Sequence, residues 1–321
     1  MSTSSLESLR AHSKIVVDTA NLDEIDKFKP EDATTNPSLI CAAIQSDKFA
    51  HMMRDAVVYA RTRLPTSALD DQVELALDKL TVDIGGHILQ KITGRVSTEV
   101  DARHSFSIEK SLEKARHIIS LYAELGIPKE RVYIKLAATW EGIQTARILE
   151  AEGIACNLTL IFAFTQAVAC AQAGVSLISP FVGRILDWHV AKGMRSCAPP
   201  EEPGVHSVVR ICRYFKLHGY PTVVMGASFR NTGEIIALAG CDKLTISPGL
   251  LDALSKADGP VDSVLLSSPT GSEPLLPPVT QDEFAFHLYS DPMAIEKLAE
   301  GIRKFHDDTC KAKAIIAKAF Q

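Results

Sequence analysis

The sequence predicts an α/β fold, a single (β/α)8 TIM barrel with additional helices. Eight short β-rich runs recur along the 321 residues, and amphipathic stretches separate them. Several of these runs are apolar on both faces, which is typical of parallel strands covered by helices. The first run is followed by Asp18-Thr19-Ala20-Asn21, and no G-x-G-x-x-G sequence occurs, which disfavours a dinucleotide-binding open sheet. Eightfold strand–helix alternation therefore favours a closed barrel.

The eight strands are expected at residues 15–18, 32–35, 94–99, 132–136, 155–160, 177–182, 222–227 and 243–246. Helical spacing of apolar residues predicts helices over 112–125, 141–152 and 229–239. The long interval 37–93 predicts two or more helices, although Gly85-Gly86 weakens the pattern of the second. The interval 184–221 predicts a loop followed by a helix, and the proline-rich stretch 267–278 predicts a surface loop.

A final helix is expected from an N-cap at Asp291, with Pro292 in its first turn, toward Phe320. Its apolar face predicts docking on the barrel or on a partner subunit, through Leu298, Ile302 and Phe305. No stretch has the composition of an interdomain linker. Residues 1–321 are therefore expected to form a single barrel domain, with the N-terminal segment and the C-terminal helix packed on it.

The composition excludes several classes of protein. Lys and Arg total 34 and Asp and Glu total 39, which gives a formal net charge of −5. Because 46% of the residues are hydrophobic and 23% are charged, the chain does not have the composition of a disordered protein. The acidic balance disfavours duplex nucleic acid as a partner, since binding to phosphates usually requires a basic face.

Cysteine and histidine usage points to an intracellular protein without a metal. The seven cysteines are scattered and form no C-x-x-C, so a disulfide framework and a zinc site are disfavoured and the reducing cytoplasm is expected. The first 13 residues have no apolar core typical of a signal peptide. Polar residues interrupt the apolar stretch 154–171, which favours a strand and a helix over a membrane span. The ten histidines form no H-x-x-x-H or H-E-x-x-H sequence.

Polar residues gather where the strands are expected to end, which is the end of a barrel that carries the chemistry. Lys135 lies within the otherwise apolar VYIKLAAT. Burial disfavours the ammonium form of a lysine, and a neutral amine is what a Schiff-base nucleophile requires. The alternative is a structural ion pair between Lys135 and Asp18 or Glu99. Lys243 stands at the start of a strand, where a surface position is expected.

Two carboxylates and a set of hydrogen-bonding side chains accompany this lysine. Asp18 and Glu99 are candidate proton carriers, or alternatively a turn cap and a partner for a neighbouring cation. Asn36 and Asn157 are suited to orienting a polyhydroxylated ligand, although Asn36-Pro37 is also a good helix start. Thr159 and Ser179 line the barrel either as ligand contacts or as hydrogen-bonded core hydroxyls.

Two arginines and a serine follow the sixth and seventh strands. Arg184, Ser228 and Arg230 would form a phosphate clamp, because late βα loops of barrels often bind phosphate and guanidinium groups bind it bidentately. The alternative is a pair of solvated arginines at helix starts. The helix dipole disfavours cations there, which weakens that alternative.

The chain closely resembles class I transaldolases of the long bacterial–eukaryotic type. The resemblance rests on Val17-Asp18-Thr19 and on the runs DATTNPSLI (32–40), GRVSTEVDAR (94–103), IKLAATWEGI (134–143), CNLTLIF (156–162), AGVSLISPFVGRILDW (173–188), VVMGASFRN (223–231), AGCDKLTISP (239–248) and DPMAIEKLAEGIRKF (291–305). It extends over nearly the whole chain, and it implies a barrel that needs no cofactor, acts on phosphorylated sugars and forms a homodimer.

The resemblance also implies a role for each candidate residue. Lys135 matches the lysine that forms the Schiff base, and Asp18 matches the general acid/base. Glu99 and Thr159 match the pair that holds and activates a water. The remaining matches are ligand-orienting residues, phosphate-binding residues and aromatic residues of the pocket, in that order: Asn36, Asn157 and Ser179; Arg184, Ser228 and Arg230; Phe181 and Trp188.

The implied reaction transfers a dihydroxyacetone unit from sedoheptulose 7-phosphate to glyceraldehyde 3-phosphate, giving erythrose 4-phosphate and fructose 6-phosphate. This reversible step belongs to the non-oxidative branch of the pentose phosphate pathway. One alternative is a class I aldolase that releases free dihydroxyacetone. Glu99 and the chain length disfavour it, because related fructose-6-phosphate aldolases are shorter and typically carry glutamine at the position of Glu99. A second alternative is a sugar-phosphate binder without catalysis, against which the set Lys135, Asp18 and Glu99 argues.

Overall fold

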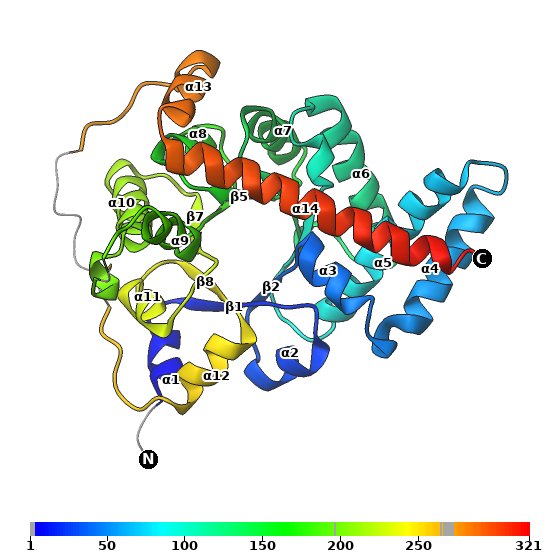
Figure 1. Cartoon of the computed structure of the whole chain (residues 1–321), viewed down its shortest axis with the longest axis horizontal. Coiled ribbons are helices and arrows are strands. Elements are labelled where there is room, and N and C mark those ends of the chain that lie inside the picture. Colours follow the sequence, from blue (N-terminus) through cyan, green and yellow to red (C-terminus); the bar gives the residue numbers. More distant parts are fainter. Residues whose placement is uncertain (1–3, 196, 264, 266–272) are drawn as a thin grey trace.

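A computed structural model describes residues 4–195, 197–263, 265 and 273–321. At its centre lies a closed barrel of parallel strands whose spatial order follows the chain (Figure 1). The strands are β1 (Lys14–Asp18), β2 (Asp32–Thr34), β3 (Val96–Glu99), β4 (Val132–Ala137), β5 (Cys156–Ile161), β6 (Leu177–Pro180), β7 (Val223–Gly226) and β8 (Lys243–Ile246). Hydrogen bonds between β1 and β8 close the barrel, which confirms the predicted (β/α)8 fold.

Helices fill the intervals between strands. The α-helices are α1 (Ser5–Arg10), α2 (Leu22–Phe28), α3 (Pro37–Ala43), α4 (Ala50–Arg63), α5 (Leu69–Leu89), α6 (Ile108–Glu124), α7 (Trp140–Ala151), α8 (Phe164–Gln172), α9 (Gly183–Ala191), α10 (Pro203–His218), α11 (Thr232–Ala237), α12 (Pro248–Lys256), α13 (Gln281–Tyr289) and α14 (Pro292–Lys318). Short 3₁₀ turns are η1 (Asp47–Phe49), η2 (Ala102–His104), η3 (Lys129–Arg131) and η4 (Pro199–Glu201).

The strand register brings the polar strand ends to one level. Every residue of β4, β5, β6 and β8 is buried, as expected for parallel strands covered by helices. Lys135 of β4 pairs in register with Glu99 of β3 on one side and with Asn157 of β5 on the other. Asp18 of β1 pairs with Thr34 of β2. The barrel thus places side chains that are far apart in the sequence beside one another.

The glycine pair expected to weaken the second helix of interval 37–93 lies inside α5, which is continuous through it. The glycines permit close packing against α6. A Cβ on Gly85 would lie 1.9 Å from the Tyr122 hydroxyl oxygen, and one on Gly86 would lie 3.1 Å from Leu125. The cost of glycine in a helix is therefore offset by a contact that no larger residue allows.

The C-terminal helix begins where the sequence predicts. Asp291 Oδ1 accepts the backbone N–H of Ala294 at 3.0 Å, and α14 runs across the mouth of the barrel (Figure 1). Leu298 and Phe305 are each 3% exposed, and α14 contacts α3, α5, α9 and the end of β5. Its apolar face therefore docks on the barrel itself.

The apolar stretch 154–171 forms β5 followed by α8, as predicted. Within the described ranges, no helix is both long and apolar enough to span a membrane. Residues 267–272 of the predicted proline-rich loop lie outside the described residues, and 273–278 form neither helix nor strand.

The prediction that Lys243 lies on the surface is wrong. Its residue exposure is 8%, and its ammonium group is paired with the carboxylate of Asp32 inside the N-terminal end of the barrel. Asp32 also accepts the backbone N–H of Arg95 at 2.8 Å. A lysine at the start of a strand can point into a barrel when a nearby carboxylate neutralises it. Because Asp32 and Lys243 are 211 residues apart, the sequence alone does not indicate that they pair.

This buried pair allows a test of stability. Lys243→Met leaves the Asp32 carboxylate buried without its partner, so the free energy of unfolding should fall by about 3–5 kcal/mol. Asp32→Asn in the same chain removes the unpaired charge and should recover much of that loss. Urea unfolding of both variants checks this, and equal stabilities of the single and double variants would contradict it.

Candidate active site

The side chain of Lys135 lies inside the C-terminal end of the barrel. Lys135 is 5% exposed, and its Nζ donates a hydrogen bond to the backbone carbonyl of Thr35 at 3.1 Å. The same nitrogen lies 3.1 Å from Glu99 Oε2, whose side chain is 4% exposed. The lysine predicted as nucleophile is therefore buried beside the carboxylate predicted as proton carrier.

Asp18 ends β1 and is held by a hydroxyl of the next strand. Thr34 Oγ1 donates to Asp18 Oδ1 at 2.8 Å and lies 2.7 Å from Thr245 Oγ1. Burial raises the pKa of Asp18 above its usual value, and the neighbouring Lys135 and the Thr34 hydroxyl partly offset this rise. Asp18 is thus a buried carboxyl group that takes up a proton more readily than one exposed to water.

Glu99 and Thr159 present polar atoms that the protein itself leaves unsatisfied. Glu99 Oε2 and Thr159 Oγ1 are buried and make no hydrogen bond to any described residue, although Oε2 stands at ion-pair distance from Lys135. Burial raises the pKa of Glu99, and Lys135 counteracts that rise. Buried unsatisfied oxygens are costly, so these two atoms are positioned for a water or a substrate hydroxyl.

Asn157 stands in the middle of a short hydrogen-bonded chain. Its Nδ2 donates to Ser97 Oγ at 3.1 Å, and its Oδ1 accepts from Ser179 Oγ at 2.6 Å. Both sides of the amide are engaged, so its orientation is fixed. Asn36 caps α3 by accepting the backbone N–H of Leu39 at 3.0 Å, which leaves Nδ2 as the group it can offer to a ligand.

Arg184, in the first turn of α9, is the more enclosed of the two predicted phosphate-binding arginines. Its guanidinium lies 4.9 Å from the centre of the Phe181 ring and 5.8 Å from that of Phe305. Nη1 is buried and has no hydrogen-bond partner among the described residues. Burial and the nearby Arg230 both lower the pKa of Arg184. An unpaired buried guanidinium donor beside a second cation is suited to bind an anion.

Arg230 and Ser228 come from the loop after β7 and lie against the start of α9. The backbone N–H of Gly183 donates to Ser228 O at 3.0 Å, which joins the two loops. Ser228 has a positive φ of 61°, and its Oγ lies 3.5 Å from Arg230 Nη1. Arg230 also forms an ion pair with Asp187, at 2.6 Å from Nη2 to Oδ2. The three predicted phosphate-binding residues are therefore together.

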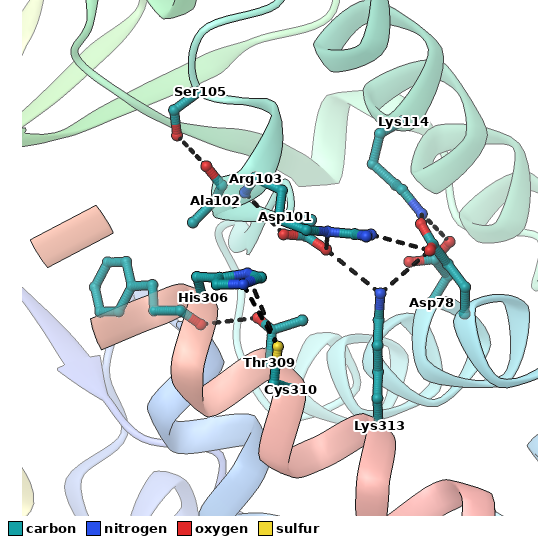
Figure 2. Close-up of polar contacts among 12 residues, drawn as sticks. Asp78, Asp101, Ala102, Arg103, Ser105, Lys114, His306, Thr309, Cys310 and Lys313 are labelled. Carbon is teal, nitrogen blue, oxygen red and sulfur yellow. Dashed lines mark hydrogen bonds and ion pairs between the residues drawn. The ribbon is translucent and has the colours of Figure 1, made fainter. Parts of the chain in front are cut away.

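Ion pairs fix the C-terminal helix α14 near the end of β3, the strand that carries Glu99. Figure 2 shows Lys313 of α14 reaching Asp101, at 3.6 Å, and Lys313 lies 3.1 Å from Glu74 of α5. Lys114 of α6 binds the same Glu74 at 2.9 Å. A cavity beneath α14 runs from Glu99 to Lys114 and Lys313. Near the N-terminus of α14, Trp188 Nε1 donates to Glu296 at 2.7 Å.

One group of described residues has the spacing of metal ligands, namely Glu74, Asp101 and His104, whose ligand atoms lie within 4.8 Å of one another. Each of its carboxylates is already paired with a cationic side chain, because Arg103 binds both at 3.0 Å and Lys313 bridges them. Little negative charge is left for a cation.

Several residues that shape the site have no role assigned to them by the sequence alone, although Thr34 and Ser97 are among the polar residues at the expected strand ends. Ser97 precedes Glu99 by two residues on one predicted strand, so period-two alternation places both side chains on the same face. Asp187 follows Arg184 by three residues on α9, so helical spacing put it on the same face. Thr245 carried no signal, since only barrel closure brings it to Thr34.

Comparison with known proteins gives a consistent result. The model of the family described as Transaldolase/Fructose-6-phosphate aldolase matches residues 15–316. A protein named Transaldolase from Vibrio cholerae is 54% identical over 312 residues, which are 97% of this chain and 98% of that protein. Proteins of the same name from Vibrio vulnificus and a Shewanella species are 53% and 51% identical, again over 97% of this chain and over 98% and 97% of their own lengths.

The barrel, the lysine within it and likeness over almost the full length agree with the resemblance inferred from the sequence motifs. This chain belongs to the transaldolase/fructose-6-phosphate aldolase family.

Proposed function

We propose that this chain transfers a dihydroxyacetone unit from sedoheptulose 7-phosphate to glyceraldehyde 3-phosphate through a Schiff base on Lys135. It is an enzyme with transaldolase activity, as identity of 51–54% to relatives of that name over 97% of the chain indicates. The observation that carries the proposed mechanism is the burial of Lys135 against Glu99, with Asn157 on the neighbouring strand β5 and Asp18 at the end of β1.

The first step joins substrate and enzyme. Neutral Lys135 Nζ attacks the C2 carbonyl of the ketose phosphate and forms a carbinolamine. Loss of its hydroxyl as water requires a proton, which Glu99 supplies through a water held by Thr159. This role is supported by the buried Thr159 Oγ1, which has no hydrogen-bond partner among the described residues, and by burial of Glu99, which raises its pKa and so favours its protonated form.

The second step breaks the bond between C3 and C4. The iminium on Lys135 accepts the electron pair, while Asp18 removes the proton from the C4 hydroxyl and erythrose 4-phosphate leaves. The remaining three-carbon enamine then adds to the aldehyde of glyceraldehyde 3-phosphate, and Asp18 returns the proton. Hydrolysis releases fructose 6-phosphate. One carboxyl group with a raised pKa serves as base and then as acid.

Polar contacts hold the enamine until the acceptor arrives. Asn157 has a fixed orientation between Ser97 and Ser179, and Asn36 offers its amide from the N-terminus of α3. Hydrogen bonds from these groups to the three-carbon unit favour its retention over protonation and release. This retention separates a transferase from an aldolase that releases dihydroxyacetone.

The phosphate groups of donor and acceptor bind in turn to Arg184, Arg230 and Ser228. The unpaired Nη1 of Arg184 supplies a buried donor, and Phe181 supports the guanidinium from one side. Arg230 exchanges its partner Asp187 for phosphate or binds both. One anion site fixes the distance from phosphate to Lys135 for both half-reactions.

The wider setting is also part of the proposal. We place the reaction in the non-oxidative pentose phosphate pathway in the cytoplasm, catalysed by one domain of residues 1–321 without a cofactor. All seven cysteines are free, which is in keeping with a reducing compartment. We expect a homodimer whose interface lies elsewhere than the apolar face of α14, because the barrel already covers that face.

Borohydride trapping tests the Schiff base. With fructose 6-phosphate and borohydride, peptide mass analysis should find a three-carbon or sugar adduct on Lys135, and Lys135→Ala should lose turnover and adduct while remaining folded. The Asp32→Asn/Lys243→Met variant, which lacks the second buried barrel lysine, is the control and should keep both. An active Lys135→Ala variant would refute the mechanism. Free dihydroxyacetone accumulating without an acceptor would favour aldol cleavage instead.

Removal of one guanidinium tests the phosphate site. Arg230→Ala should raise KM for phosphorylated substrates roughly 10- to 100-fold, the worth of a hydrogen bond between charged groups. KM for unphosphorylated glyceraldehyde should change little. Arg210→Ala is the control, because Arg210 is also an exposed arginine paired with a carboxylate, that of Glu273. Equal losses with both acceptors would count against the role.

The hydroxyl of Thr34 offers a test by pH. Cleavage needs Asp18 as carboxylate, so kcat should fall as pH drops through the pKa of Asp18. The Thr34 hydrogen bond lowers that pKa. Thr34→Val should therefore move the acid limb of the kcat profile to higher pH, by roughly one pH unit, whereas Thr34→Ser should leave it in place. An acid limb that stays unchanged in Thr34→Val would exclude Asp18 as the titrating group.

A further inference from the structure

Gln166, near the start of α8, has a fully buried side chain whose hydrogen-bonding capacity is completely used by backbone groups. Its Nε2 donates to the carbonyl of Ala138 at 2.8 Å and to that of Leu160 at 3.1 Å. Its Oε1 accepts the N–H groups of Phe162 and Ala163, each at 2.9 Å. Two donors and two acceptor sites are all that an amide has.

These four groups belong to the ends of the two strands that carry the central chemistry. Ala138 directly follows β4, three residues after Lys135, and Leu160 directly follows Thr159 in β5. The backbone N–H of Ala138 also donates to the carbonyl of Thr159 at 2.8 Å. The amide of Gln166 therefore sets how the end of the lysine strand lies against the end of the threonine strand.

The end of β5 has a conformation that needs such support. Leu160 has a left-handed φ of 57°, and the register of β5 against β6 shifts between Leu158 and Ile161. Residues with a Cβ disfavour this conformation, so it persists only where surrounding contacts hold it. Gln166 forms hydrogen bonds with both peptide groups that flank Ile161, at Leu160 O and at Phe162 N.

The C-terminal helix lies directly over this distortion. A Cβ on Gly301 of α14 would lie 2.6 Å from Leu160 Cδ2, so the helix approaches the leucine as closely as glycine allows. The Leu160 side chain thus packs beneath α14, and Thr159 is the residue directly before it in β5. Two elements remote in sequence, α8 and α14, therefore both contact this strand end.

We propose that Gln166 is a positioning residue that fixes Thr159 Oγ1 relative to Lys135 Nζ and Glu99 for the water-mediated proton transfers. The inference rests on the proposed function and adds to it a residue that touches no reacting atom. The order in which bonds form and break in the proposed mechanism is unchanged. What Gln166 controls is the geometry in which the carbinolamine loses water and in which the product iminium regains it.

The test is Gln166→Leu, which removes all four hydrogen bonds at similar volume. Its kcat should fall about 100-fold, the loss that a misplacement of about 1 Å causes. KM for phosphorylated substrates should stay within about threefold, because Arg184 and Arg230 lie on other loops. In single turnovers the borohydride-trapped adduct on Lys135 should reach the wild-type amount, but about 100-fold more slowly.

Gln172→Leu is the matched control. Gln172 ends the same helix and also binds backbone through its amide, to Pro277 O at 2.9 Å and from Val279 N at 2.8 Å, but on a loop away from the site. Its kcat should stay at the wild-type value. If Gln166→Leu is folded and keeps kcat within threefold of wild type, the proposal is overturned. Absence of any adduct in the wild type would instead overturn the proposed function.

Gln166→Glu decides the matter if the leucine variant does not fold. A neutral carboxyl group accepts both N–H groups and donates to one carbonyl, whereas a carboxylate places negative charge against the Ala138 and Leu160 oxygens. The variant should approach wild-type kcat at low pH and lose it as pH rises through the pKa of the introduced acid. A kcat profile with the same shape as that of the wild type would overturn the proposal.

Discussion

Burial of one lysine governs the design of this molecule. An ammonium group inside a barrel is unstable unless carboxylates or carbonyl oxygens surround it, and Lys135 meets this need with Glu99 and the carbonyl of Thr35. The carboxyl groups of Glu99 and Asp18 are buried as well, and burial raises the pKa of each. The same burial that brings Lys135 against Glu99 therefore raises the pKa values of the two carboxyl groups to which we assign proton transfer.

The proposed anion-binding site is a positively charged region in a chain whose net charge is negative. The chain carries a net charge of −5, yet its substrates are phosphates. Arg184 and Arg230 concentrate positive charge at the mouth of the barrel, and the lowered pKa of Arg184 reports that concentration, together with its burial. Asp187 neutralises one of the two guanidinium groups in the free protein. The phosphate site that we propose therefore depends on a few atoms of two arginines, and the overall charge of the chain gives no indication of it.

What the sequence predicts well is what depends on local pattern. Strand runs, the N-cap at Asp291 and the strand-end positions of Lys135 and Asp18 follow from periodicity and from the rule that barrels work at their C-terminal ends. What it predicts poorly depends on partners across the barrel. Lys243 is buried and not on the surface because Asp32, far away in the sequence, pairs with it. No feature of the sequence indicates that Gln166 binds the backbone of Ala138, 28 residues away. Family resemblance supplied the roles, but it did not supply these contacts.

The two buried lysines of the barrel differ in how completely the groups around them are paired. Lys243 is matched by the Asp32 carboxylate, whose second oxygen is occupied by the Arg95 N–H, so every strong group has a partner. Around Lys135 the match is incomplete, because Glu99 Oε2 stands at ion-pair distance without a hydrogen bond and Thr159 Oγ1 has no partner in the described structure. Unsatisfied buried atoms lower stability, and they persist where a ligand completes them. The difference between the lysines thus lies in what the neighbouring strands leave unpaired. In the mechanism we propose, a water or a substrate hydroxyl fills this deficit at the C-terminal end of the barrel.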